Sequence, residues 1–301
     1  MIEMSDPLSP VTPDSELVAL DAALVRLLER RAALTAERGF VPAAEAEELR
    51  RIFEGRLTGD GTLVLGDGAA LRPAALAQVW RALVMGALTQ RGDFSVAVCA
   101  GDDPVNALEL VRAYFGALVP VMMAGSAVSV VKAVAEGVAT VGLMPDPAAG
   151  DDDSAWWTHL VSPSPGAPRI FAQLPFVQDP PGLTPLYAVS TRQLAPSGND
   201  TTLVVAIGRG DTSRTRLQEA VTRAGLTATV VAAARPDADE QRLFVLLALE
   251  GFVAAGDARL HALEAGQFAP VERVELVGVY PNPLRVAAPL PSATTGEENV
   301  A

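Results

Sequence analysis

The hydrophobic periodicity of this 301-residue chain changes near residue 94, and this change constrains the fold more than any other feature. Before it, apolar residues recur at the three- and four-residue spacing of amphipathic helices. We therefore predict helices over 13–39, 43–56 and 73–90. After it, short apolar runs alternate with helical segments, which is typical of a parallel α/β unit. The chain should begin with a helical unit and continue with an α/β unit.

Each of the three predicted helices carries an apolar stripe that we expect to face a core. Thr12 and Pro13 suit the N-cap and the first position of the first helix, and Gly39 suits its end. The stripe of this helix consists of Leu17, Leu20, Leu24, Leu27, Leu28 and Leu34. The stripes of the other two helices contain Leu49, Ile52 and Phe53, and Leu76, Val79, Trp80, Leu83 and Ala87.

The last part of the chain predicts strands and helices in the order βαββαβ, which is that of the ferredoxin-like module. A turn-rich stretch, PSGND, separates it from the α/β segment. The predicted fold class is therefore α+β with several domains. We place these at 13–91 (helical), 94–195 (α/β) and 200–285 (ferredoxin-like), with disordered tails at 1–12 and 286–301.

The charge of the chain limits its partners. The formal net charge is -13, the isoelectric point is near 4.6, and Lys132 is the only lysine. Nucleic-acid-binding surfaces need clustered Lys and Arg to displace counterions from phosphates, so we predict no nucleic-acid partner. The single cysteine, Cys99, excludes an internal disulfide framework and a Cys-rich zinc site, and fits a reducing cytoplasm.

The sequence does not indicate a membrane protein. Residues 115–131 form the longest uncharged run, but Pro120 and Gly125 interrupt it, and we interpret it as buried strands. Residues 1–15 are acidic and proline-rich, unlike the basic start and apolar core of a secretory signal. We therefore expect a cytoplasmic protein with no membrane partner.

Near its end the chain resembles the regulatory ACT domain of prephenate dehydratases. That domain ends on Leu-Gly-Ser-Tyr-Pro, and here residues 277–281 read Val-Gly-Val-Tyr-Pro. The segment AAARP, ending at Arg235 and Pro236, stands where the family has Glu-Ser-Arg-Pro, and GDTS, from Gly210 to Ser213, stands where it has Gly-Ala-Leu-Ser. These two family segments bind phenylalanine. The resemblance thus implies an effector site at these four named residues, although only half of each motif is kept.

The middle resembles the opening lobe of prephenate dehydratase, through SVAVCAGDDPVNALELVRAYFG and AVAEGVATVGLMP. The turns that supply polar groups to the substrate in that family read GDDPVN and MPDP here. The distance from Pro145 to the ACT-like strand is too short for a second lobe of ordinary size. Thr191 and Arg192 match two residues of the family's catalytic Thr-Arg-Phe, but they follow a predicted strand. We rank dehydratase activity last.

The helical head resembles the all-helical chorismate mutase domain, through LDAALVRLLERRAAL, EAEELRRI and WRALVMGALTQ. Taken in order, the three parts resemble the bifunctional chorismate mutase/prephenate dehydratase of phenylalanine biosynthesis. The resemblance implies conversion of chorismate to prephenate by a pericyclic rearrangement, with no cofactor and no metal. Helices this short need a partner to complete a bundle, so we expect a homodimer.

A mutase site must hold two substrate carboxylates with fixed cations and stabilise charge on the ether oxygen. By the resemblance, Arg31, Glu45 and Gln90 are the catalytic candidates, and each lies on the inward stripe of its helix. Two positions depart from the family: Asp14 and Ala44 stand where it has arginines. The family's lysine has no counterpart.

Two functions therefore remain open, and the first of them is our leading hypothesis. One is a chorismate mutase-like isomerase, which the inward Arg31, Glu45 and Gln90 favour. The other is a non-catalytic aromatic-metabolite-binding or regulatory protein on the same domains, which the missing cations favour. A purely structural interpretation of the site also stands, in which Arg31 pairs with Glu45 at the edge of the core.

Overall fold

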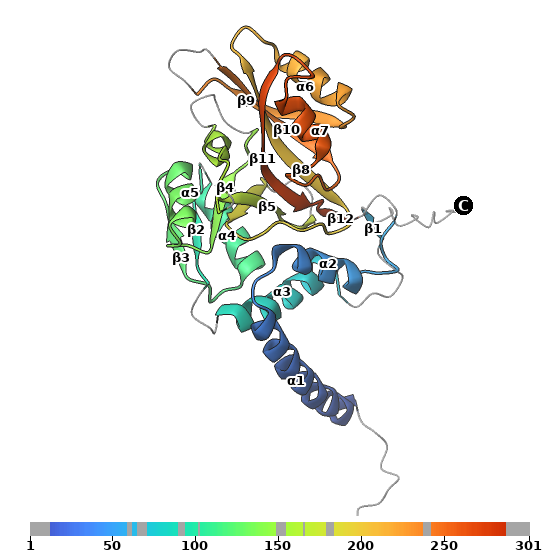
Figure 1. Ribbon diagram of the computed structural model, residues 1–301. Helices are drawn as coiled ribbons and strands as arrows, with labels where there is room; N and C mark the ends of the chain where they lie inside the picture. The colour runs from blue at the N-terminus through green and yellow to red at the C-terminus, as the bar shows by residue number, and fades with distance from the viewer. Residues whose placement is uncertain are drawn as a thin grey trace, which may run out of the picture.

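The molecule combines a helical region, from which one long helix projects, with a large sheet that carries helices on its faces (Figure 1). Of residues 42–45 only the backbone is described. The computed structural model describes residues 13–58, 62–64, 71–89, 94–101, 103–148, 155–164, 166–178, 184–236 and 242–286.

Three helices form the N-terminal region, close to the predicted bounds: α1 (Pro13–Arg38), α2 (Pro42–Ile52) and α3 (Pro73–Thr89). Gly39 ends α1 with a φ of 74°, a left-handed conformation that costs glycine little. Pro42 begins α2, where its missing N–H has no intrahelical partner to lose. In Figure 1, α2 and α3 lie below the sheet, whereas the N-terminal part of α1 leaves the body.

The prediction that the leucine stripe of α1 is buried was wrong for the single chain. Leu28 is half-buried, and Thr35 is the buried residue of this helix. The other stripe residues are 54–68% exposed: Leu17, Leu20, Leu24, Leu27 and Leu34. An apolar stripe predicts that a helix packs against another apolar surface. It does not show which surface that is. We call residues 13–27 of α1 the arm.

The middle of the chain forms the predicted alternation of strands and helices. The carboxylate of Asp103 caps α4 by accepting the N–H of Asn106 at 3.0 Å, and the Ser126 hydroxyl caps α5 in the same way. Strands β2, β3 and β4 are parallel, and β7 runs antiparallel to β4 and β5. The elements are β2 (Val96–Val98), α4 (Pro104–Phe115), β3 (Val121–Met123), α5 (Ala127–Ala135), β4 (Val141–Pro145), η2 (Trp156–Leu160), β5 (Arg169–Leu174) and β7 (Leu186–Ser190).

The last part contains the predicted βαββαβ series, and its four strands lie in the order β11-β8-β10-β9. Strand β8 pairs antiparallel with both β11 and β10, which places the first strand of the series at its centre. The helices cover one face of these strands (Figure 1). The elements are β8 (Asp200–Arg209), α6 (Arg214–Arg223), β9 (Ala228–Ala234), β10 (Arg242–Glu250), α7 (Ala258–Glu264) and β11 (Val271–Pro281).

One registered residue pair between β11 and β5 joins the two sets of strands into one nine-stranded sheet. Strand β11 pairs with β5 through Gly278 and Ile170, giving the order β3-β2-β4-β7-β5-β11-β8-β10-β9. A Cβ atom on Gly278 would lie 2.5 Å from the Ile170 Cβ and 2.6 Å from its carbonyl oxygen, so only glycine fits there. The sheet therefore continues across the domain boundary that we predicted at 195–200.

A second, three-stranded sheet connects distant parts of the chain. Its parallel strands are β1 (Thr62–Leu63), β12 (Leu284–Val286) and β6 (Val177–Gln178), with β12 in the centre. Leu63 and Leu284 are buried in the same core as Leu49 and Phe53 of the head. That core also takes in α4 and the middle strands, so α2 and α3 do not form an independent hydrophobic unit.

In the described ranges, we find no helix of the length and apolar character that crossing a membrane requires.

Candidate functional site

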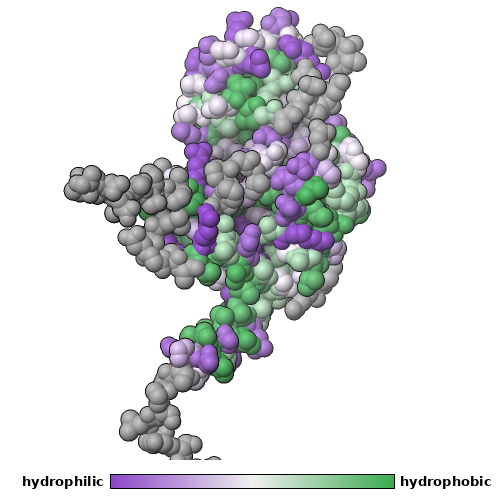
Figure 2. Space-filling view, turned by 180° about the vertical axis from the view of Figure 1, so that it is seen from behind, coloured by the Kyte–Doolittle hydropathy of each residue, from purple (hydrophilic) through white to green (hydrophobic). Residues whose placement is uncertain are grey.

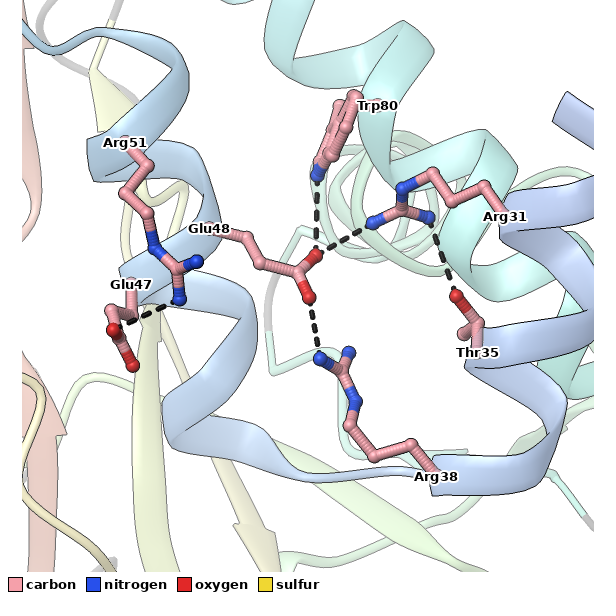
Figure 3. A network of polar contacts seen from close by, with 7 residues as sticks. All are labelled: Arg31, Thr35, Arg38, Glu47, Glu48, Arg51 and Trp80. Atoms are coloured by element: carbon pink, nitrogen blue, oxygen red, sulfur yellow. Dashed lines mark hydrogen bonds and ion pairs between the residues drawn. The ribbon is translucent and has the colours of Figure 1, made fainter. Parts of the chain in front are cut away.

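The polar centre of the head lies where α1, α2 and α3 meet, and Arg31 of α1 is part of it (Figure 3). Arg31 faces Glu48 of α2, with 2.6 Å between its Nη2 and the Glu48 Oε2. Arg38, two turns further along α1, donates to the other carboxylate oxygen of Glu48 at 2.5 Å. One carboxylate is thus held between two guanidinium groups. We call Arg31, Arg38, Glu48 and Trp80 the Glu48 cluster.

Trp80 of α3 completes the cluster. Its indole Nε1 lies 3.4 Å from the Glu48 Oε2, and the guanidinium carbon of Arg31 lies 4.0 Å from its ring centroid. The Arg31 side chain also donates to the hydroxyl of the buried Thr35. Stacking on an aromatic face fixes a guanidinium plane, so Arg31 is oriented by Trp80 as well as by its ion pair.

The Glu48 cluster is only partly accessible to solvent. The Glu48 side chain is 16% exposed, that of Arg31 22% and that of Arg38 38%. The space between α2 and α3 beside Glu48 and Trp80 does not admit a water molecule. In the single chain, the cluster therefore has the chemistry of a carboxylate-binding site, but the carboxylate it holds is its own.

The structure places one of the three predicted catalytic residues in this cluster. Arg31 lies at its centre, on the side of α1 that faces Glu48 and Trp80. Glu45 lies on α2, but its side chain is outside the described atoms, and Gln90 is outside the described residues. Glu48, about one helical turn after Glu45, is a partner of Arg31, and the pairing of Arg31 with Glu45 stays a prediction.

Sequence reasoning missed Glu48, the role of Trp80 and the role of Arg38. Glu48 precedes the buried Leu49 on α2, so helical geometry alone puts it at the edge of the inward face. A second missed residue is Arg81, which is 6% exposed and lies with its guanidinium carbon 3.2 Å from the Tyr114 ring centroid. In the sequence, Arg81 directly follows Trp80 of the inward stripe. This neighbouring pair was the available signal for the roles of Trp80 and Arg81.

Arg50 lies on another side of α2 and binds backbone instead of acids. Its Nη1 donates to the carbonyl and hydroxyl oxygens of Ser197 at 2.9 and 2.7 Å, and its Nη2 donates to the carbonyls of Asn199 and Asn282 at 2.9 and 3.2 Å. The head is thereby tied to the segment before β8 and to the end of β11. We call this set the Arg50 latch.

The positive charge of Arg50 is partly balanced by the carboxylate of Asp200, to which Ser197 links it. Burial lowers the pKa of the Arg50 guanidinium, and the attraction of Asp200 partly offsets this effect. Asp200 is itself buried, and its carboxylate accepts hydrogen bonds from the Ser197 hydroxyl and the Ser197 and Gly198 N–H groups. Ser197 thus links the cation and the carboxylate.

The predicted effector residues lie at one end of the ferredoxin-like strands. Gly210 follows β8, and Ser213 caps α6 by accepting the N–H of Arg216 at 3.3 Å. Arg235 and Pro236 follow β9 and are exposed. Because β10 is antiparallel to both β8 and β9, these two strands point the same way. Both effector segments therefore lie at one edge of the sheet, about two strand spacings, or roughly 10 Å, apart.

Comparison with known proteins gives fold likenesses only. No protein-family model matches the chain, and no curated protein matches it. A quorum-quenching acylase, GqqA, superposes with a TM-score of 0.44 and 19% identity over 62% of this chain and 94% of that one. A prephenate dehydratase from Streptococcus mutans gives 0.44 and 11% over 64% and 99% of the two chains. The enzyme from Arthrobacter aurescens, solved with L-Phe, gives 0.43 and 12% over 62% and 90%. Similarity at this level does not establish a family.

Proposed function

We propose that this protein is non-catalytic and that it binds an aromatic metabolite or has a regulatory role. Its head resembles chorismate mutase in form and contributes to assembly. The observation that carries the proposal is the position of Glu48, whose carboxylate binds both Arg31 and Arg38. The mutase reaction needs cations that are available to two substrate carboxylates. Here two cations of α1, Arg31 and Arg38, already hold an internal carboxylate.

The energetics of exchange also favour a non-catalytic head. A substrate carboxylate that displaced Glu48 would replace one charge-assisted contact by another, so the net gain in binding is small. Glu48 would remain nearby and repel the incoming anion. Two arginines that hold an internal carboxylate stabilise the transition state less. Because each 1.36 kcal/mol of lost transition-state stabilisation lowers the rate about tenfold, turnover is strongly reduced.

The ferredoxin-like tail is where we place the binding function. The resemblance implies Gly210, Ser213, Arg235 and Pro236 as effector residues, and both segments lie at the same sheet edge. The exposed Arg235 is a donor for a ligand carboxylate, and the first turn of α6 after Ser213 presents backbone N–H groups. An amino acid or an aromatic carboxylic acid fits these groups.

Chorismate mutase-like isomerase activity is the second candidate. One observation favours it: Trp80 and Thr35 hold Arg31 in a fixed orientation beside a second cation, Arg38. Such preorganisation is what a carboxylate-binding catalytic site requires. In this alternative, Glu48 must leave the two arginines when chorismate binds.

We also propose that the protein is a homodimer. The exposed apolar residues of the arm support this, because a helix with an uncovered apolar face is stabilised when a partner covers it.

The first test is the loss of chorismate absorbance with purified protein, beside the Arg31→Ala and Glu48→Gln variants. We expect no turnover above the uncatalysed background for the natural chain. Saturable turnover that Arg31→Ala abolishes would overturn the proposal in favour of the isomerase. Glu48→Gln separates the causes, because turnover in this variant alone would show that the internal carboxylate blocks an otherwise competent site.

The second test is thermal unfolding with phenylalanine, tyrosine and prephenate. A ligand that binds the native state alone must raise the melting temperature. We expect such a rise with at least one of them, and its loss in Arg235→Ala but not in the control Arg192→Ala, an exposed arginine on the connection between β7 and β8. No rise with any of the three would contradict the binding function.

A further inference from the structure

The arm presents an apolar face that the other described residues of its chain leave exposed. Leu17, Leu20, Leu24 and Leu27 lie at helical spacing and are 54–68% exposed, and Val18 and Val25 widen this face. Figure 2 shows hydrophobic surface along the arm and onto the adjoining body. An isolated helix of this length is marginal in water, so an arm with this composition requires a surface to pack against.

A groove of about 910 Å³ runs along the outer face of α4. Its apolar lining comes from Val105 and Leu108 of α4, which are 66% and 41% exposed, and from Met123 of β3, which is 52% exposed. Gln78 of α3 and Arg112 of α4 add polar groups. An apolar centre with polar groups around it is the composition of a protein interface. We call this the α4 groove.

The arm and the α4 groove match in length and character. The groove is lined from Pro104 to Ala113, which spans about 14 Å of helix, and the arm's stripe from Leu17 to Leu27 spans about 15 Å. The arm presents apolar side chains three and four residues apart, and α4 presents Val105 and Leu108 three residues apart, so that ridges of one helix can pack beside those of the other. In the arm and in the groove alike, the exposed surface extends over about two to three helical turns.

The two surfaces cannot meet within one molecule. Helix α1 is continuous from Pro13 to Arg38 and carries the arm away from the body, whereas α4 lies on the body (Figure 1). In a twofold dimer, however, each arm can reach the groove of the other copy, and both apolar surfaces of both copies are then covered at once. A second copy of this chain is therefore the occupant that the molecule itself supplies.

We propose that the arm of one copy packs in the α4 groove of a second copy, so that the head of each protomer contacts α4 of the other. This inference rests on the homodimer proposed above and adds the surfaces that form it. It differs from pairing of the two arms with each other, which would leave Val105, Leu108 and Met123 uncovered.

Crosslinking between two differently labelled copies tests the proposal. In a Cys99→Ser background, one preparation carries Leu20→Cys and the other Leu108→Cys, and a short bismaleimide is added to each alone and to the mixture. We expect a crosslinked dimer in the mixture and little in either preparation alone. Crosslinking of Leu20→Cys to itself, with none to Leu108→Cys, would overturn the arm-in-groove arrangement while leaving the homodimer in place.

Light scattering of the full chain separates this failure from failure of the dimer. We expect a dimer, with dissociation constants raised by roughly tenfold or more in Leu20→Glu and in Val105→Glu, since a charge would enter an apolar interface. Val138→Glu is the matched control, because Val138 is 60% exposed and lies outside the groove. A monomeric natural chain would overturn both the dimer and its surfaces. A dimer as tight in Val105→Glu as in Val138→Glu would overturn the groove alone.

Discussion

Helix α2 takes part in two polar sites that differ in what they bind. Glu48 reaches the side chains of Arg31 and Arg38, both charged and both from one neighbouring helix. Arg50, two residues later, reaches mainly main-chain carbonyls, from segments that are distant in sequence. The Glu48 cluster joins side-chain charges to one another, whereas the Arg50 latch joins a side-chain charge mainly to backbone.

This difference indicates different roles for the two sites. Charged side chains can exchange one partner for another, which suits a site that once received or still receives a carboxylate ligand. Carbonyls of a folded backbone cannot move away, and they lose their partner outright if the cation is removed. We infer that the Arg50 latch holds the head on the sheet and that the Glu48 cluster keeps the capacity to bind an anion.

Removing the Arg50 latch should have the largest effect on stability. Arg50→Met keeps much of the apolar stem but removes four hydrogen bonds, so we expect a loss of about 2–4 kcal/mol in the free energy of unfolding by denaturant titration. Arg51→Met is the matched control, since Arg51 makes an exposed pair with Glu47 and should cost about 0.5 kcal/mol or less. Equal losses in the two variants would mean that the latch does not hold the domains.

Neutralising Glu48 should cost less, because its two arginines can turn to solvent. We expect Glu48→Gln to lose about 1–2 kcal/mol at low ionic strength, and this loss should shrink in high salt. Glu47→Gln provides the control on the exposed side of the same helix. The idea that the Glu48 cluster is an anion site fails if Glu48→Gln does not gain thermal stabilisation from added dicarboxylates relative to the natural chain.

A double-mutant cycle measures whether the two sites act independently. Glu48→Gln and Arg31→Ala share one ion pair and should show a coupling energy of about 1 kcal/mol. Glu48→Gln and Arg50→Met share no partner, and their effects should add to within about 0.5 kcal/mol. A large coupling in the second cycle would show that α2 transmits changes from one site to the other.

The exposed pair of Asp257 and Arg259 should give the smallest effect and provides a reference for both sites. Hydrogen bonds from Arg259 lower the pKa of Asp257 from 3.8 to about 2. A lowered folded-state pKa adds stability that is fully present above pH 3.8 and is lost as the pH falls through about 2. In acid unfolding, Asp257→Asn should therefore differ slightly from the natural chain above pH 4 and not at all below pH 2. A difference that persists below pH 2 would assign the effect to packing.

The sequence predicted the local elements of this fold better than their partners. Helical spacing placed α1, α2 and α3, and the change of period near residue 94 placed the alternating strands. The pairing of Gly278 with Ile170 was not predictable, because it joins two segments that share no local pattern. For the same reason, the short strands β1 and β12 were missed, since each consists of two or three residues that form a strand only by pairing with segments distant in sequence.

The candidate site was predicted in part. Arg31, one of the three candidates, lies in the polar centre of the head, but the stripe that suggested it is largely exposed, and its catalytic role stays a prediction. Glu48 was not predicted as a partner of Arg31, because Glu45 and Glu48 lie one turn apart on α2 and the sequence pattern does not show which acidic residues of that helix meet Arg31. The roles of Glu45 and Gln90 stay predictions. Arg50 was not assigned to any site, since its acceptors are backbone atoms that no side-chain pattern reveals.

Because β12 is the central strand of the small sheet, the head cannot finish folding early during synthesis of the chain. Strand β1 of the head pairs with residues 285 and 286, and the buried Leu284 fills the same core as Leu49 and Phe53. During translation, the ribosome completes the head long before it reaches these residues. Part of the apolar surface of the nascent head therefore stays exposed to solvent. The head becomes fully native only after the whole ferredoxin-like region has emerged.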